Sequence, residues 1–238
     1  DESLLLHYQP QLSLTTRRVT VAEALLRWRR PDGSIAPAAE FIALASQSDL
    51  ISQLNSWVLE AALAAAARQR LQGWPDLRVA INVSSRQLLR HDLIHDIRTV
   101  LSRSSIARGT LKLELTESLV MENPEYAAQM LQRIRELGVG LSLDDFGTGH
   151  SSLAYLQRFP FDTIKIDQSF VRPTSRGTRP VLLKSIVAMA HDLGMSVVAE
   201  GAESDSDAVE LSQMGCEYAQ GFAFGEPMSA DAARRMLN

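Results

Sequence analysis

Polar side chains recur at matching points along this 238-residue chain, each at or just beyond the end of a short apolar run. Most of them are carboxylates, and the others are one lysine and two carboxamides. The set comprises Glu23, Asn82, Glu114, Asp144, Asp145, Lys165, Glu200 and Gln220. If the apolar runs are parallel strands of one barrel, their carboxyl ends meet at a single mouth, where the active sites of such barrels lie.

Carboxylates gathered at one mouth repel one another and raise one another's pKa unless cations offset them. Hard divalent ions relieve this repulsion, and an all-oxygen set of Asp, Glu and Asn suits Mg²⁺ or Mn²⁺. The expected ligands of a first ion are Glu23, Asn82, Glu114 and Asp144. Those of a second ion are Asp144 as a bridge, Asp145 and, directly or through water, Glu200. Two ions ~3.5–4 Å apart are the usual arrangement for cleaving phosphodiesters.

Each of these residues also has an ordinary structural explanation. A single Glu at a strand end is usually a solvated rim residue or a partner of a helix N-terminus. Asp144-Asp145 is compatible with a simple turn, and Lys165 with a surface position. However, Lys165 lies between Ile164 and Ile166, so in a strand it points opposite to them. The recurrence over seven strand ends favours a shared site.

A glycine-rich loop, DFGTGHSS at 145–152, follows the fifth apolar run. Gly and Ser mark turns in general, so the loop alone is weak evidence for a site. Its DFG run is also found in kinases, but no Gly-rich ATP loop or HRD run accompanies it. Beside two predicted metal ligands, the loop is typical of a mobile lid over an active site. The five histidines are scattered without ligand spacing, and we expect them to be non-catalytic.

The elements that must position these side chains follow from hydrophobic periodicity. Strands are expected at 4–9, 19–27, 77–83, 111–115, 140–143, 163–166, 196–199 and 218–222. Helices are expected at 51–71, 86–103, 124–137, 180–193 and 205–214. Eight strands alternating with helices predict the α/β class and a TIM-like (β/α)8 barrel.

The connection between the first two strands departs from this alternation. Only nine residues separate Gln9 from Val19, whereas a parallel crossover needs a dozen or more. The first two strands are therefore expected to form a hairpin, so that the first strand is antiparallel to the other seven.

The composition excludes several classes of protein. Apolar residues make up 45% of the chain and charged residues 22%, a globular balance that argues against disorder. The single cysteine, Cys216, excludes an intramolecular disulfide and a cysteine-based zinc site, which fits a reducing, cytoplasmic compartment. The net charge of −4 does not indicate a nucleic-acid polymer or a membrane as partner.

We expect one domain over residues 1–238, because no repeat, low-complexity tract or linker divides the chain. The apolar stretch at 57–67 is shorter than the ~18–20 residues of a membrane span, and no signal peptide is visible. The sequence does not begin with Met, and we expect it to be a piece of a longer, multidomain protein.

Seven motifs, in order and over nearly the whole chain, resemble those of the EAL-domain cyclic-di-GMP phosphodiesterases. They are EALLRW at 23–28, NVS at 82–84, ELTE at 114–117, DDFGTG at 144–149, KID at 165–167, AEGAE at 199–203 and QG at 220–221. The resemblance implies a barrel with one antiparallel strand. It also implies hydrolysis of one phosphodiester of cyclic di-GMP to linear pGpG, dependence on Mg²⁺ or Mn²⁺, and inhibition by Ca²⁺.

The resemblance also implies roles for individual residues. Glu200 is the candidate general base, Lys165 positions the attacking water, Glu23 is a catalytic metal ligand, and Arg27 pairs with a substrate phosphate. The remaining substrate-binding candidates are Gln9, Leu26, Asp167 and Gln220. The residues implied to support the loop are Glu117, Glu203, Gly147, Thr148, Gly149 and Ser151.

Departures from the family pattern leave the metal positions intact. They are His150 in place of an aromatic residue, Ala202 in place of a larger aliphatic one, and Glu226 where a basic residue is frequent. The resemblance implies a homodimer and an N-terminal sensor or cyclase domain. Two alternatives remain open: a degenerate receptor that only binds cyclic di-GMP, and a regulatory domain that acts through protein partners.

Overall fold

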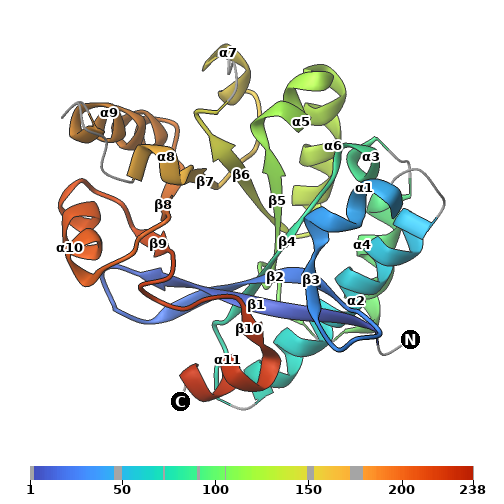
Figure 1. Cartoon of the computed structure of the whole chain (residues 1–238). Coiled ribbons are helices and arrows are strands. Elements are labelled where there is room, and N and C mark those ends of the chain that lie inside the picture. Colours follow the sequence, from blue (N-terminus) through green and yellow to red (C-terminus); the bar gives the residue numbers. More distant parts are fainter. Residues whose placement is uncertain are drawn as a thin grey trace.

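The strands of the chain close into a barrel surrounded by helices, as the computed structural model shows (Figure 1). It describes residues 3–45, 50–71, 73–89, 92–104, 106–148, 153–171 and 179–237. The strands within these ranges are β1 (Leu4–Ser13), β2 (Val19–Arg29), β3 (Ile35–Pro37), β4 (Arg78–Asn82), β5 (Leu111–Thr116), β6 (Gly140–Phe146), β7 (Thr163–Ile166), β8 (Ser196–Glu200), β9 (Tyr218–Gln220) and β10 (Met228–Ser229). Pairing follows the order β1-β9-β8-β7-β6-β5-β4-β2, and the β1–β2 pair closes the ring, which confirms the predicted barrel.

The first strand runs against its neighbours, as predicted. Strand β1 pairs antiparallel with β2 on one side and with β9 on the other, whereas β2 and β4 through β9 are parallel. The hairpin turn follows Ser13, and Arg17 adopts a left-handed φ of 57° there. The short strands β3 and β10, which were not predicted, extend the sheet beyond the ring.

Helices cover the outside of the barrel. Those of eight residues or more are α2 (Leu50–Leu71), α4 (Leu93–Arg103), α6 (Pro124–Glu136), α9 (Arg179–Asp192), α10 (Asp205–Gln213) and α11 (Ala230–Leu237). The shorter ones are η1 (Ala38–Glu40), α1 (Ile42–Ala45), α3 (Ser85–Leu88), α5 (Glu117–Glu122), α7 (Leu153–Leu156) and α8 (Gln168–Val171). The prediction of a single helix at 86–103 was wrong, because α3 and α4 are separate elements.

Helix α2 has the length and composition of a membrane span over Leu50–Arg70, which the sequence analysis did not expect. Its apolar residues Leu59, Ala62 and Leu63 are buried in the main hydrophobic core against the barrel. Packing on the barrel therefore accounts for part of the hydropathy of this helix, since 39% of the span is buried.

The inside of the barrel is polar, and its outside is apolar. On β5, Leu111, Leu113 and Leu115 belong to the core beneath the helices, while Lys112 and Glu114 alternate with them and point the opposite way. Barrels of this type usually fill their interior with branched apolar side chains. The polar interior of this one therefore points to a function for the buried charges.

Candidate active site

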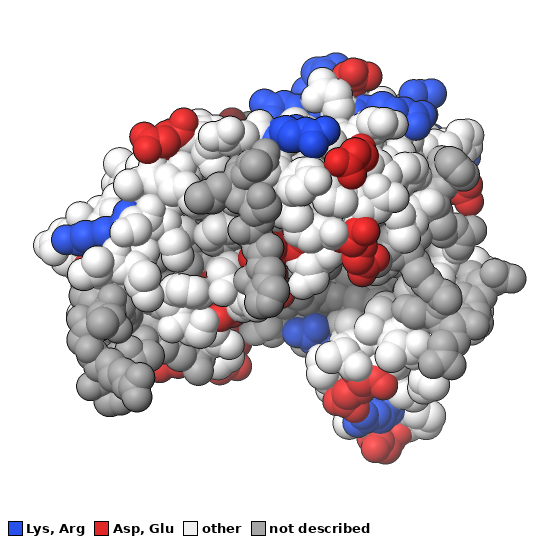
Figure 2. All heavy atoms as spheres, turned by 90° about the horizontal axis from the view of Figure 1, so that it is seen from above, with Lys and Arg blue, Asp and Glu red and all other residues white. Residues whose placement is uncertain are grey.

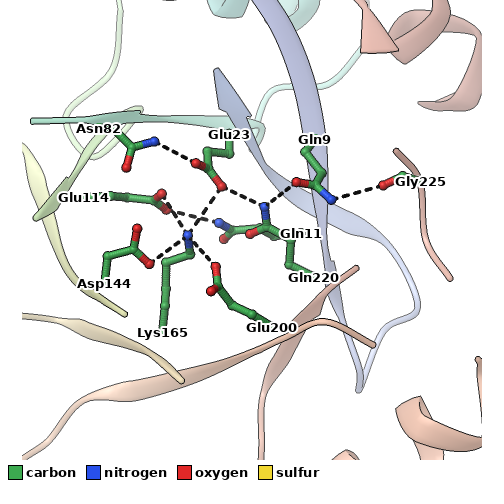
Figure 3. Close-up of polar contacts among 10 residues, drawn as sticks. All are labelled: Gln9, Gln11, Glu23, Asn82, Glu114, Asp144, Lys165, Glu200, Gln220 and Gly225. Atoms are coloured by element: carbon green, nitrogen blue, oxygen red, sulfur yellow. Dashed lines mark hydrogen bonds and ion pairs between the residues drawn. The ribbon is translucent and has the colours of Figure 1, made fainter. Parts of the chain in front are cut away.

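The centre of the barrel mouth is the ammonium group of Lys165, on β7, which is 1% exposed. Figure 3 shows four carboxylates from four other strands converging on it. Their oxygens lie 2.8 Å (Glu200 Oε1), 3.0 Å (Glu114 Oε2), 3.1 Å (Asp144 Oδ1) and 3.4 Å (Glu23 Oε2) from Nζ. One cation is thus shared among four carboxylates, which leaves a local excess of negative charge.

Strand register brings these side chains to one level. Asn82 at the end of β4 pairs with Glu114 on β5, and Glu200 at the end of β8 pairs with Gln220 on β9. Inward-facing residues alternate along every strand, so polar residues at strand ends face a shared space. The sequence prediction that these residues share one mouth rests on the same geometry.

Carboxamides orient the carboxylates. Asn82 Nδ2 donates to Glu23 Oε1 at 2.7 Å, and Gln220 Nε2 donates to Glu23 Oε2 at 2.7 Å and to Gln9 Oε1 at 3.1 Å. Gln11 Nε2 donates to Glu114 Oε1 at 3.1 Å. Gln11 was not predicted as a site residue, although it lies two positions from Gln9 on one face of β1, and that spacing is a usable signal.

Burial and charge together shift the ionisation of the cluster. Burial raises the pKa of Glu114 well above its ordinary value, and the charge of Glu23 adds to this. Burial would also raise the pKa of Glu23, but Lys165 and the amides of Gln220 and Asn82 outweigh it and lower the pKa. For Glu200, burial dominates over the attraction of Lys165 and raises the pKa to about 7.

The ammonium of Lys165 stays charged in this setting. Burial alone would lower its pKa, but the surrounding carboxylates, led by Glu114, raise it well above the ordinary value. Because the pKa of Lys165 lies far above neutral pH, its ammonium group keeps its positive charge and does not transfer protons.

Asp145 lies beside the cluster in an unusual backbone conformation. The β6–β7 register shifts between Leu143 and Phe146, and Asp145 has a φ of 54°, in the left-handed region that non-glycine residues seldom adopt. Such strain tends to occur at functional sites. Burial and the neighbouring charge of Asp144 raise the pKa of the Asp145 carboxyl.

The donor set fits a hard divalent ion. Carboxylate oxygens of Asp144, Asp145 and Glu200 lie within 4.8 Å of one another, and two of these carboxyls have raised pKa values that a cation would lower. Glu23, Asn82 and Glu114 lie on the other side of Lys165 and supply further oxygens. All six predicted metal-ligand positions are thus in one region of the mouth.

The start of the glycine-rich loop is tied to α5. Glu117, 2% exposed, accepts a hydrogen bond at Oε2 from the backbone N–H of Gly147 at 3.1 Å. Gly147 has a φ of 97°, and a Cβ at this position would collide with the ring of Phe170. Thr148 Oγ1 donates to the carbonyl of Asp145 at 2.9 Å. Gly149 and Ser151, and also His150, lie outside the described residues.

Two of the predicted substrate-binding residues, Gln9 and Gln220, lie beside this cluster. Gln9 and Glu203 line a hollow of about 210 Å³ beside Glu200, and the exposed ring of Phe222 forms part of the same wall. Phe222 was not predicted as a site residue. The hollow is large enough for part of a ligand beside the carboxylates.

The other three substrate-binding candidates, Leu26, Arg27 and Asp167, are not among the residues that line this hollow. Arg27 is half-buried on β2, and its Nη1 donates to the carbonyl of Leu26 at 3.0 Å. Leu26 itself is buried in a small apolar cluster with Ile51 and Leu54. Asp167 accepts the backbone N–H of Ser169 at 2.9 Å, at the start of α8.

A barrel whose mouth holds a lysine among clustered carboxylates has oxygen donors suited to divalent ions, at the end of the barrel where active sites of this fold lie. The chain belongs to the EAL domain family, whose model matches residues 1–227.

Curated relatives and solved structures agree with this assignment. The chain is 41% identical over 238 residues to cyclic di-GMP phosphodiesterase NbdA of Pseudomonas aeruginosa, covering 100% of this chain and 30% of the relative. It is 40% identical to cyclic di-GMP phosphodiesterase PdeR of Escherichia coli, covering 99% of this chain and 35% of the relative. It therefore spans about a third of the length of these relatives. A structure of the PaMucR phosphodiesterase in complex with c-di-GMP superposes with a TM-score of 0.92 at 35% identity, covering 98% of this chain and 94% of that one.

Proposed function

We propose that this chain hydrolyses cyclic di-GMP to linear pGpG in a metal-dependent reaction. The observation that carries the proposal is the convergence of four carboxylates on the buried ammonium of Lys165, beside the Asp144, Asp145 and Glu200 oxygens. The names of its relatives NbdA and PdeR, and the c-di-GMP complex of PaMucR, support the same substrate.

The mechanism assigns separate tasks to the residues of the mouth. When bound, divalent ions supply Lewis acidity and offset the negative charge of the phosphate. Glu200, with a pKa near neutrality, accepts the proton of the attacking water. Lys165 orients that water and stabilises charge that grows in the transition state. Arg27 holds a phosphate oxygen through its planar fork.

Further residues hold the substrate and the lid. Gln9, Leu26 and Asp167 contact the guanine and ribose side, and Gln220 completes the water and substrate network. Glu117 and Glu203 support the loop that begins at Gly147. The catalytic task of Glu23 is to present a metal-facing oxygen, for which its hydrogen bonds from Asn82 and Gln220 support a fixed orientation.

We propose that the ions are two Mg²⁺ or Mn²⁺, because the donors are all oxygen. We also propose that Ca²⁺ inhibits the reaction, as the resemblance to the EAL family implies. We also propose a homodimer in the cytoplasm and an additional N-terminal sensor or cyclase domain. In support of the additional domain, the relatives are about three times as long as the chain. One relative, MucR, is named as a bifunctional diguanylate cyclase and phosphodiesterase.

The test is direct turnover. Purified protein is incubated with cyclic di-GMP and Mg²⁺ or Mn²⁺, and the products are separated by chromatography. We expect pGpG to form, Ca²⁺ to suppress it, and Asp144→Asn to remove most activity while the protein remains folded. Asp76→Asn changes an exposed aspartate that precedes the amino end of β4, whereas the proposed ligand Asn82 is at the carboxyl end of that strand. It is the matched control and should retain activity.

Binding without pGpG in any of these metals would overturn the enzyme proposal in favour of a receptor. Near-normal turnover by a folded Asp144→Asn protein would overturn the two-metal arrangement.

A further inference from the structure

The end of the barrel opposite the carboxylate cluster contains a second polar cavity, with a volume of about 280 Å³. Its walls come from the first residues of successive strands, among them Arg78 of β4, Gly140 of β6, Thr163 of β7 and Ser196 of β8. Gly140, Thr163 and Ser196 are small where barrels usually place bulky branched residues. The space is therefore open because of the residue types at these positions.

A buried ammonium group borders this cavity. Lys112 is 5% exposed, and its Nζ lies 3.3 Å from Asp162 Oδ1 and donates to Thr163 Oγ1. Asp162 is already engaged, because its Oδ2 accepts the backbone N–H of Leu141 at 2.8 Å and its Oδ1 accepts Thr163 Oγ1 at 2.9 Å. An ammonium has three N–H donors, so among the described residues one donor of Lys112 remains for an occupant of the cavity.

The charge on the cavity wall is the reverse of that at the mouth. Two cations, Lys112 and Arg78, face one carboxylate, Asp162, in a protein whose net charge is −4. Lys112 is buried and Arg78 is exposed. An excess of cations on a cavity wall favours an anionic ligand, and the interaction with the buried Lys112 is the stronger because it lies away from bulk water.

We propose that this cavity binds a small oxyanion, of the size of inorganic phosphate or a short carboxylate, through Lys112 and Arg78. Its volume admits such an ion with a few waters and lies just below the range of cavities that hold drug-sized ligands. The cavity is also linked to the mouth, since Gln11 forms part of its wall and donates to Glu114 at 3.1 Å. An occupant that contacts Gln11 is one hydrogen bond away from the proposed metal ligands.

The experiment measures thermal unfolding of the full chain in EDTA, so that metal at the mouth does not contribute. Sodium phosphate, sulfate, acetate and succinate are titrated against sodium chloride at equal ionic strength. We expect at least one oxyanion to raise Tm by about 3 °C or more at tenfold its Kd, with a rise that grows logarithmically at higher concentration. Comparing phosphate with acetate and succinate shows whether the cavity prefers a phosphate-like or a carboxylate anion.

Three variants locate the effect. Lys112→Met should abolish the rise in Tm above chloride, and Arg78→Gln, at an exposed position, should weaken the affinity at least about fivefold. Arg27→Gln, which alters the mouth, should leave the rise intact. No rise above chloride, a rise that survives Lys112→Met or Arg78→Gln unchanged, or a rise lost in Arg27→Gln would each overturn the proposal. If Lys112→Met does not fold, Arg78→Gln decides alone.

Discussion

At the level of single residues, substitution of Lys165 can distinguish a residue that binds the substrate from one that accelerates its hydrolysis. Its ammonium lies within 3.4 Å of four carboxylates and is 1% exposed, and in the proposed mechanism it contacts the attacking water and not the bases of the dinucleotide. Interactions that strengthen in the transition state affect turnover more than ground-state binding.

Lys165→Met keeps the apolar stem of the side chain and removes its charge. We expect this variant to bind cyclic di-GMP within about tenfold of the parent and to hydrolyse it ~10²-fold or more slowly, the loss typical of one electrostatic donor. Calorimetry in Ca²⁺ measures the binding, and product chromatography in Mg²⁺ the turnover. Lys184→Met, at an exposed position on α9, is the matched control. Equal losses of binding and turnover would make Lys165 an anchor for the ligand instead.

Substitution of Gln11 tests how much the amides that orient the carboxylates contribute to metal affinity. Gln11→Leu keeps the approximate volume but removes the donor to Glu114 Oε1, whose pKa burial already raises. Groups that orient metal ligands typically contribute 10–100-fold to metal affinity. We expect about tenfold weaker Mn²⁺ binding by calorimetry in Gln11→Leu. An unchanged Mn²⁺ affinity would show that Glu114 needs no such orientation.

At the level of elements, much of the barrel could be predicted from the sequence. Period-two alternation and the short link between Gln9 and Val19 gave all eight barrel strands and the antiparallel first one. Strands β3 and β10 were missed because three and two residues are too few for a pattern. Strand β1 extends to Ser13 and not only to Gln9, and the shorter prediction concealed Gln11.

The conformation of Asp145 could not be predicted, because it arises from pairing between strands. The register shift between Leu143 and Phe146 exists only once β6 meets β7, and it gives Asp145 its left-handed φ. The sequence shows two adjacent aspartates, which in a regular strand would point to opposite faces. The shift is what lets carboxylate oxygens of both lie within 4.8 Å of Glu200.

The link between α5 and the glycine-rich loop gives a prediction at this level. Glu117→Ala removes the acceptor of the Gly147 N–H, whereas Glu117→Gln retains an amide oxygen that can accept the same bond. In the Glu117→Ala variant we expect the amide hydrogen of Gly147 to exchange faster with solvent. We also expect kcat to fall about tenfold or more. Glu117→Gln should recover most of both. The same exchange rate in parent and Glu117→Ala would contradict a supporting role for Glu117.

At the level of the whole molecule, the fold buries a small set of charged side chains inside the barrel, among them Glu23, Glu114 and Lys165, and leaves most of the others at the surface. Acidic and basic side chains are interspersed on the face seen from above in Figure 2, in agreement with a modest net charge of −4. Within the mouth, by contrast, four carboxylates share one lysine, and this imbalance opposes folding unless protons or cations relieve it. Binding of a divalent ion at the mouth is therefore expected to be coupled to folding.

This coupling predicts that stabilisation by metal depends on pH. Glu200 has a pKa of about 7 in the folded protein against an ordinary 4.5, so the folded state holds the proton more tightly than the unfolded state. This proton binding contributes about 3 kcal/mol to the free energy of unfolding. The contribution is fully present below pH ~4.5 and is lost as the pH rises through about 7. Glu114, whose pKa burial also raises, acts in the same direction.

Divalent ions bind the deprotonated carboxylates, so protons compete with metal below pH 7 and cease to compete above it. We therefore expect a fixed Mg²⁺ concentration to raise Tm more at pH 8 than at pH 6, each measured against EDTA at the same pH so that metal-independent titrations cancel. Glu200→Gln should make this increment both smaller and less dependent on pH. An increment that is equal at pH 6 and pH 8 in the parent would mean that Glu200 is already ionised in the metal-free protein, and that Lys165 offsets its burial more fully than the geometry indicates.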